Sequence, residues 1–143
     1  MIKNLLLIDD DEITLKILKL LIVRQHFAEN IITRKNGKEG LDYFDELSTQ
    51  PGADEVPDLI LLDINMPVMN GWDFLDDYSQ RFETKFPNTK VCMLSSTVDP
   101  ADFQKASNYA CVISFVSKPL LMSEVEMLRK LEPLRHFFEP SLS

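Results

Sequence analysis

The segment Asp58-Leu59-Ile60-Leu61-Leu62-Asp63 decides the fold. Its four consecutive aliphatic residues present apolar side chains to both faces of a strand, whereas a half-exposed strand would alternate apolar and polar residues. Such runs are typical of central strands in a parallel sheet that helices cover on both sides. We therefore predict a buried strand over Asp58–Leu62, with the carboxylate of Asp63 at its carboxyl end.

Apolar runs and helical patterns alternate on both sides of this strand. Four further strands are predicted over Asn4–Ile8, Asn30–Arg34, Lys90–Leu94 and Val112–Val116. Helices are predicted over Glu12–Gln25, Gly37–Leu47 and Trp72–Phe86, with two more that begin near Asp99 and Ser123. Five successive strand–helix units predict an α/β fold with a doubly wound five-stranded parallel sheet and helices on both faces.

Local signals set the predicted helix ends. Asp99 is a candidate N-cap because Pro100 suits the first helical position. Ser123 and Glu126 have the spacing of a capping box for the last helix. In the first helix, the 3.6-residue period predicts an inward face that consists of Ile13, Ile17, Leu18 and Leu21.

Composition and charge limit the function classes. The chain has 143 residues, which fits one domain, and a net charge of -8 with a pI of about 4.7. An acidic surface repels nucleic-acid phosphates and anionic lipid, so neither is an expected partner. The apolar run Leu5–Ile8 is too short for a signal peptide or a membrane span, which favours the cytoplasm. Cys92 and Cys111 are predicted to be buried free thiols.

The predicted folded unit covers residues 1–132, and residues 133–143 form a C-terminal extension. The extension contains Phe137 and Phe138 between two prolines, Pro133 and Pro140. These aromatic residues either cap the core or pair two chains, so the sequence is compatible with a monomer or a weak homodimer.

Polar side chains gather where the predicted strands end. Asp9 and Asp10 follow the first strand, Asp63 the third, Ser95 the fourth and Lys118 the fifth. Sites in an open parallel sheet form beyond these carboxyl ends, so the side chains are expected to converge. Crowded carboxylates repel each other, and a hard divalent cation such as Mg²⁺ resolves that conflict.

This set of residue types favours phosphoryl chemistry on a side chain. Asp63 can act as a nucleophile and become an aspartyl-phosphate. Lys118 and Ser95 can hold phosphoryl oxygens while the metal spreads the developing charge. The four glycines form neither a GxxxxGK nor a GxGxxG loop, which argues against a nucleotide-binding enzyme.

Four motifs together resemble the receiver domain of two-component response regulators, and the resemblance spans about residues 3–131. It implies a flavodoxin-like sheet with strand order 2-1-3-4-5. It also implies a stand-alone, chemotaxis-type receiver, because few residues remain after the last helix for an output domain. The motifs are Leu5-Leu6-Leu7-Ile8-Asp9-Asp10-Asp11, Leu61-Leu62-Asp63-Ile64-Asn65-Met66-Pro67-Val68-Met69-Asn70-Gly71, Met93-Leu94-Ser95-Ser96 and Phe115-Val116-Ser117-Lys118-Pro119.

The resemblance assigns a role to each site residue. Asp63 matches the phosphoacceptor, and Lys118 matches the phosphate-binding lysine, whose bond to the following proline is typically cis. Ser95 matches the switch hydroxyl and Phe115 the switch aromatic, which is frequently Tyr in the family. The implied Mg²⁺ ligands are Asp9, Asp10, Asp63 and the backbone carbonyl of Asn65.

The resemblance further implies a signalling domain rather than an enzyme, although one that assists its own phosphorylation and dephosphorylation. A histidine kinase or a histidine phosphotransfer protein is the expected phosphodonor, and an unidentified downstream protein or a phosphorelay is the expected output. Leu15 and Ile22, which fall off the predicted inward face of the first helix, either form a docking patch for the donor or are scattered surface residues.

Two alternatives remain open. The chain could be a receiver-fold binding module that signals without phosphorylation, although its intact acid, hydroxyl and lysine set argues against that. It could also be a phosphatase-like hydrolase with an aspartate nucleophile. Such enzymes typically carry a second acid two residues after the nucleophile, where this chain has Asn65, which cannot act as a general acid.

Overall fold

The fold is an open parallel sheet with helices on both sides. The computed structural model describes residues 1–50, 55–97 and 99–139. The strands are β1 (Ile2–Ile8), β2 (Ala28–Arg34), β3 (Leu59–Asp63), β4 (Lys90–Ser95) and β5 (Val112–Ser117). The helices are α1 (Glu12–Arg24), α2 (Gly37–Thr49), α3 (Gly71–Arg81), α4 (Pro100–Ala106), α5 (Met122–Lys130) and α6 (Glu132–Arg135).

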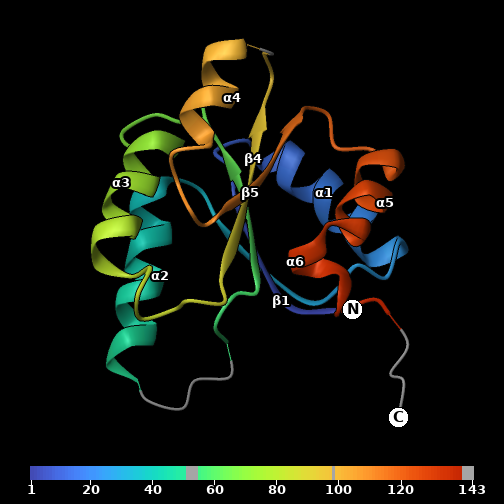
Figure 1. Cartoon of the computed structure of the whole chain (residues 1–143), viewed down its shortest axis with the longest axis horizontal. Helices are drawn as coiled ribbons and strands as arrows, with labels where there is room; N and C mark the ends of the chain where they lie inside the picture. The colour runs from blue at the N-terminus through green and yellow to red at the C-terminus, as the bar shows by residue number, and fades with distance from the viewer. Residues whose placement is uncertain (51–54, 98, 140–143) are drawn as a thin grey trace.

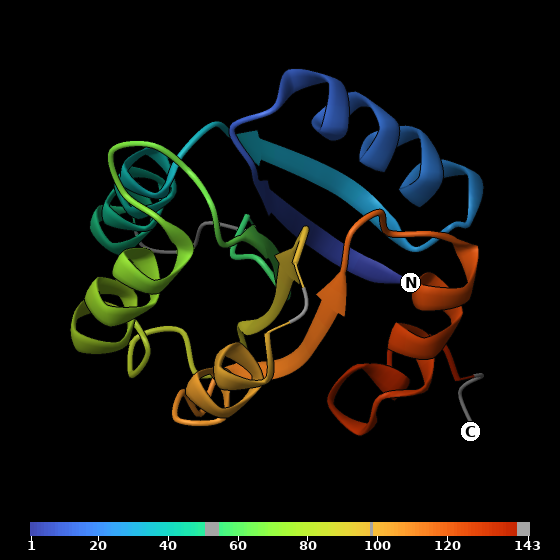
Figure 2. The ribbon, with the colours of Figure 1, turned by 90° about the horizontal axis from the view of Figure 1, so that it is seen from above.

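The sheet order is β2-β1-β3-β4-β5, with every neighbouring pair parallel. This order confirms the predicted doubly wound, flavodoxin-like fold. Figure 2, seen from above, shows the sheet between α2 and α3 on one side and α1, α5 and α6 on the other.

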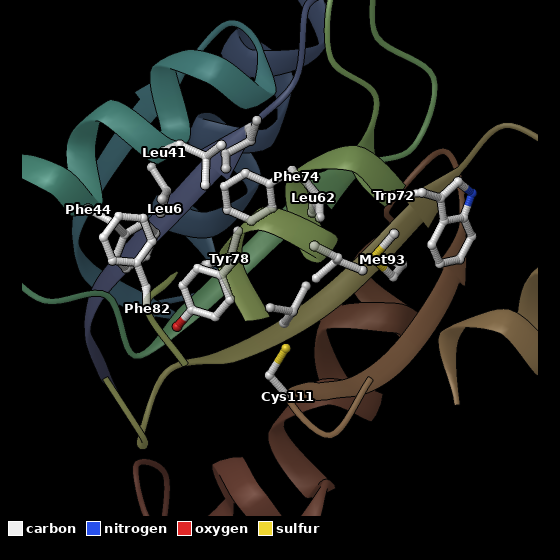
Figure 3. Packing of buried hydrophobic residues seen from close by; sticks show 14 of the residues in the cluster. Leu6, Leu41, Phe44, Leu62, Trp72, Phe74, Tyr78, Phe82, Met93 and Cys111 are labelled. Atoms are coloured by element: carbon white, nitrogen blue, oxygen red, sulfur yellow. The ribbon is translucent and has the colours of Figure 1, made fainter. Parts of the chain in front are cut away.

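Each face of the sheet has its own core. Alternate residues of β1 point to opposite sides: Leu6 and Ile8 pack in the layer under α2 and α3, and Leu5 and Leu7 in the layer under α1 and α5. The side chains of β3 are buried along its whole length, as its uninterrupted aliphatic run predicts. The core under α2 and α3 is rich in aromatic rings, among them Phe44, Phe74, Tyr78 and Phe82 (Figure 3).

The predicted inward face of α1 is only partly right: Leu18 is buried and Leu21 packs against the core, but Ile13 and Ile17 face solvent. Leu15, Leu18 and Ile22 are the buried residues of this helix, whereas Ile13 and Ile17 are 68% and 58% exposed. The helix carries two aliphatic stripes with helical spacing on nearly opposite sides, so periodicity alone cannot choose between them. Because Leu15 and Ile22 are core residues, they cannot form the suggested docking patch.

Two predicted helix ends also differ from the structure. The capping box of Ser123 and Glu126 is absent: α5 begins at Met122 without a side-chain cap, and Ser123 donates to the carboxylate of Glu124 inside the helix. The third helix ends at Arg81 rather than Phe86, because the next residues fold into turns that pack Phe82 and Phe86 against the ring of Phe44. By contrast, Asp99 caps α4 as predicted, with its carboxylate 2.9 Å from the amide of Ala101.

The residues after α5 pack onto the α1–α5 layer. Leu134 of α6 is fully buried, and Phe138 stacks on Phe27 with ring centroids 5.3 Å apart. The amino group of Met1 donates to the carbonyl of Phe137 at 2.7 Å, which brings the chain start beside this segment. Of the two predicted roles for Phe137 and Phe138, the structure confirms the first: both rings pack against the core. Residues 140–143 lie outside the described part.

Both cysteines are buried free thiols, as predicted. Burial raises the pKa of the Cys92 thiol to about 12 and that of the Cys111 thiol to about 11. Both thiols therefore stay protonated near neutral pH and act as apolar packing residues.

Candidate functional site

Strand register brings the predicted site residues to one edge of the sheet. Leu62 pairs with Ile8, so Asp9 and Asp63 each come one residue after a paired position. Asp63 in turn pairs with Leu94, and Ser95 pairs with Ser117, which precedes Lys118. The carboxyl ends of four adjacent strands therefore place these polar residues in a row, as the sequence predicted.

Three carboxylates meet at this edge. One oxygen from each of Asp9, Asp10 and Asp63 lies within 4.8 Å of the other two. Asp9 and Asp63 are 2% and 4% exposed, whereas Asp10 is exposed. Hard oxygen donors at this spacing, partly open to solvent, fit a divalent cation such as Mg²⁺ that keeps some of its waters.

Lys118 supplies the positive charge between the buried acids. Its Nζ lies 2.7 Å from Asp9 Oδ2 and 3.2 Å from Asp63 Oδ1. The Lys118–Pro119 peptide bond is cis, as the resemblance implied. The backbone amide of Lys118 donates to the carbonyl of Ser95 at 2.7 Å, which joins the ends of β4 and β5 beside the acids.

The electrostatics of the site set the pKa of Asp63. Burial is the main cause that raises this pKa from its ordinary value of 3.8 to about 6, and the negative charge of Asp9 adds to the rise. The nearby Lys118 opposes both effects. For Lys118, burial disfavours the ammonium, but its hydrogen bond with Asp9 and the two negative charges outweigh that cost and raise its pKa. Burial and the negative charge of Asp9 thus disfavour the ionised form of Asp63.

The loop after Asp63 approaches the site closely. The amide of Gly71 donates to the carbonyl of Ile64 at 2.8 Å, and a Cβ at Gly71 would lie 2.6 Å from the carbonyl oxygen of Asp63. A side chain at this position would therefore collide with the backbone of Asp63. This contact explains why the loop needs Gly71, and it seats the first turn of α3 against the backbone of Asp63.

These observations agree with the comparisons with known proteins. The model of the response regulator receiver domain matches residues 5–131. The chain belongs to the response regulator receiver domain family. Its strand order is thus that of a signalling domain of two-component systems.

Two solved response regulator structures are similar to this chain over nearly their whole length. A two-component response regulator from Cytophaga hutchinsonii is 35% identical with a TM-score of 0.83, and the alignment covers 94% of this chain and 98% of that one. A response regulator receiver protein from Dyadobacter fermentans is 28% identical with a TM-score of 0.73, covering 90% and 97% of the two chains.

Curated relatives are longer than this chain. A protein-glutamate methylesterase/protein-glutamine glutaminase of Geobacillus kaustophilus is 30% identical over 116 residues, which cover 81% of this chain and 30% of that protein. A two-component response regulator of Oryza sativa subsp. indica is 25% identical, with coverage of 92% and 56%. The chain thus spans about a third to a half of these two relatives.

Ser95 and Phe115, the two residues predicted to act as a switch, are both engaged in local contacts. The Ser95 side chain is buried, and its hydroxyl donates to the carbonyl of Thr97 at 2.8 Å and accepts from the Thr97 amide at 3.2 Å. Phe115 is half-buried against Phe103 of α4, with ring centroids 4.4 Å apart. Sequence reasoning gave no role to Thr97 or Phe103, because neither belongs to a motif and their contacts with Ser95 and Phe115 depend on the assembled fold.

Two further residues lie near the site, Asn65 and Asp11. Asn65, expected to offer its backbone carbonyl, is exposed in the loop two residues after Asp63. Asp11, which follows the pair Asp9 and Asp10, caps α1: its Oδ1 accepts from the amide of Ile13 at 2.9 Å. The amide of Asp11 in turn donates to Asp9 Oδ1 at 2.9 Å, which fixes the orientation of the Asp9 carboxylate.

An apolar pocket of about 310 Å³ adjoins the site. It lies between α1 and the segment after β5. The residues lining the pocket are Thr14, Ile17, Leu18, Leu94, Lys118, Pro119 and Leu120.

No helix in the described ranges is long and apolar enough to cross a membrane.

Proposed function

We propose that Asp63 accepts a phosphoryl group from a phosphohistidine of a histidine kinase or a histidine phosphotransfer protein, in a magnesium-dependent reaction. The observation that carries the proposal is the placement of Asp63: a buried carboxylate beside Asp9 and Asp10, with the Lys118 ammonium 3.2 Å away. The proposed destination of the signal is protein binding or onward transfer of the phosphoryl group.

The transfer exchanges one bond to phosphorus for another. A carboxylate oxygen of Asp63 attacks the phosphorus, the new P–O bond forms, and the P–N bond of the phosphohistidine breaks. The electron pair of that bond returns to the imidazole nitrogen. Lys118, which contacts Asp63 in the free site, is positioned to pair with a phosphoryl oxygen once the carboxylate has been esterified.

Magnesium fits the donor set of the chain. The proposed ligands are the carboxylates of Asp9, Asp10 and Asp63 with the backbone carbonyl of Asn65. A bound Mg²⁺ would offset the negative charge of the acids and of the transferring phosphoryl group.

The phosphoryl group would act as a switch through Ser95. A hydroxyl that donates to a new phosphoryl oxygen must give up its donation to the Thr97 carbonyl, which would rearrange the segment before α4. Because Phe115 packs on Phe103 of α4, a shift of this helix changes the space open to the Phe115 ring. Phosphorylation would thus alter the surface around α4 and β5.

The donor protein is proposed to dock on the outer stripe of α1, defined as Ile13, Ile17 and Leu20. These three side chains are 58–68% exposed, and Ile17 also lines the pocket beside Lys118. The stripe therefore adjoins the pocket that Lys118 lines, and Lys118 contacts Asp63 at 3.2 Å. Lys16 and Lys19 are exposed on the same helix of an otherwise acidic chain, which favours a donor helix with apolar and acidic residues.

Incubation with acetyl phosphate and Mg²⁺, followed by intact-mass spectrometry, tests the proposal. The wild type is expected to gain one phosphoryl group, Asp63→Asn none, and the exposed control Asp42→Asn one. A gain that survives Asp63→Asn would refute the proposed phosphoacceptor. Unchanged partner affinity after beryllofluoride treatment would favour the binding module, and multiple turnover of a phosphate ester would favour the hydrolase.

A further inference from the structure

Helix α4 has few attachments to the rest of the domain. Its seven residues include one buried side chain, Ala106, while Phe103 remains 43% exposed. In Figure 1, α4 projects beyond the other helices near the carboxyl end of β4. The few side chains that do hold this helix therefore have a large influence on its position.

One such attachment joins the C-terminal end of α4 to α3. We call it the α3–α4 latch, which comprises Trp72 and Asp76 of α3, Lys105 of α4 and Tyr109 in the turn after α4. Trp72 and Tyr109 stack with ring centroids 6.1 Å apart, and Lys105 Nζ lies 4.6 Å from the centroid of the Trp72 ring. The hydroxyl of Tyr109 donates to Asp76 Oδ1 at 2.6 Å.

The hydrogen bond of the latch is present throughout the neutral pH range. Burial, followed by the hydrogen bond to Asp76 and its negative charge, raises the pKa of Tyr109 to about 12. The phenol is therefore protonated and remains a donor. Trp72 is buried in the same core as Met93, and Figure 3 shows it apart from the main aromatic group, on the Met93 side.

The latch begins beside the phosphoacceptor. Gly71 packs against the backbone of Asp63, and Trp72 is the next residue along α3. From the other direction, Ser95 and its hydrogen-bonded turn lead into the N-terminal end of α4. Helix α4 is thus connected to the site at both ends: through Ser95 at its start and through the latch at its finish.

We propose that the α3–α4 latch holds α4 in its unphosphorylated position and opposes the state that a phosphoryl group at Asp63 favours. This inference rests on the proposed function, because it requires an acyl phosphate or its analogue at Asp63. Binding free energies are reciprocal: if phosphorylation weakens the latch, then weakening the latch strengthens binding of a phosphoryl analogue. The latch would thereby set the basal activity of the switch.

Beryllofluoride with Mg²⁺ tests this linkage on the full chain. Its dissociation constant is measured by ¹⁹F NMR for the wild type, Tyr109→Phe and Asp76→Ala. The first variant removes the donor of the latch hydrogen bond and the second removes its acceptor. The matched control is Tyr43→Phe on α2, which removes a phenol hydroxyl that donates to the carbonyl of Glu55 at 2.5 Å. Both latch variants are expected to bind about 3- to 10-fold more tightly, and the control to bind like the wild type.

Fluorescence supplies a second measurement, because Trp72 is the only tryptophan of the chain. Its emission is expected to change when the wild type binds beryllofluoride, and to change less in Tyr109→Phe. Latch variants that lose stability to urea yet bind beryllofluoride with wild-type affinity would overturn the latch alone, since the hydrogen bond would then be merely structural. A wild type that binds no beryllofluoride would overturn the proposed function and the latch with it.

Discussion

Replacing Asp63 by Asn is expected to stabilise the metal-free protein at neutral pH. The pKa of Asp63 rises from 3.8 to about 6 on folding, so the folded chain holds its proton more tightly than the unfolded chain does. Stability therefore falls as the pH rises from about 4 to about 6, and the full penalty persists above that window. At about 1.4 kcal/mol for each pKa unit, the penalty reaches about 3 kcal/mol. The amide side chain of the variant cannot ionise, so the substitution removes this penalty.

Urea unfolding in EDTA at two pH values measures this penalty. The stability gap between Asp63→Asn and the wild type is expected to be about 1.5 kcal/mol at pH 5.0 and about 3 kcal/mol at pH 7.5. The matched control, Asp42→Asn, replaces an exposed carboxylate on α2. The difference in stability between this control and the wild type should be near zero at both pH values. Adding Mg²⁺ in place of EDTA is expected to stabilise the wild type and narrow its gap to Asp63→Asn.

Two results would refute this reasoning. A gap that is the same at pH 5.0 and pH 7.5 would mean that ionisation of Asp63 does not cause the difference in stability. A wild type that is more stable than Asp63→Asn at pH 7.5 would mean that the attraction between Lys118 and Asp63 outweighs burial and the repulsion from Asp9.

Three further substitutions test other parts of the site. Gly71→Ala is expected to cost roughly 2 kcal/mol in urea unfolding and to slow phosphorylation by acetyl phosphate, because its Cβ would lie 2.6 Å from the carbonyl oxygen of Asp63; unchanged stability would contradict that contact. Ile17→Asp should change stability by less than about 0.5 kcal/mol but slow phosphoryl transfer from a phosphorylated histidine phosphotransfer protein by roughly tenfold, while the rate of phosphorylation by acetyl phosphate stays the same. Met127→Asp on α5 is the control, and equal effects of the two variants on transfer would exclude α1 as the docking surface. Lys118→Met should lower stability by about 1–3 kcal/mol at pH 7.5, because two buried carboxylates lose their cation. The loss of stability should be smaller at pH 5.0, where Asp63 is mostly protonated, and a loss that does not depend on pH would argue against the pairing of Lys118 with Asp63.

The sequence predicted the site better than it predicted the surfaces of the domain. The position of Asp63 depends on one strand and its sharp end, and a continuous aliphatic run marks both without tertiary information. Parallel topology then brings the other strand ends together, which is why Asp9, Ser95 and Lys118 were found as well. These predictions needed only the order of the strands and the residue that follows each one.

The face of α1 could not be predicted in this way. Two aliphatic stripes on one helix satisfy the same period, and only the packing of Leu15 and Ile22 against the sheet shows which stripe is inside. The same limit applies to the latch: Trp72 and Tyr109 are 37 positions apart in the sequence and belong to no common motif. Contacts between layers depend on the assembled fold, and local patterns do not encode them.

The strain at Asp63 and the proposed switch have one physical origin. Burying a carboxylate beside other acids destabilises the metal-free fold, and only part of that cost is offset by Lys118. A ligand that satisfies the acids, or a bond that turns Asp63 into an ester, changes the balance of forces at the ends of β3 and β4. The nearest groups able to respond are the Ser95 turn and the first turn of α3, and both lead to α4. A weakly attached helix at that position can convert a local change of charge into a change of surface, which is why the latch should control how readily the switch turns.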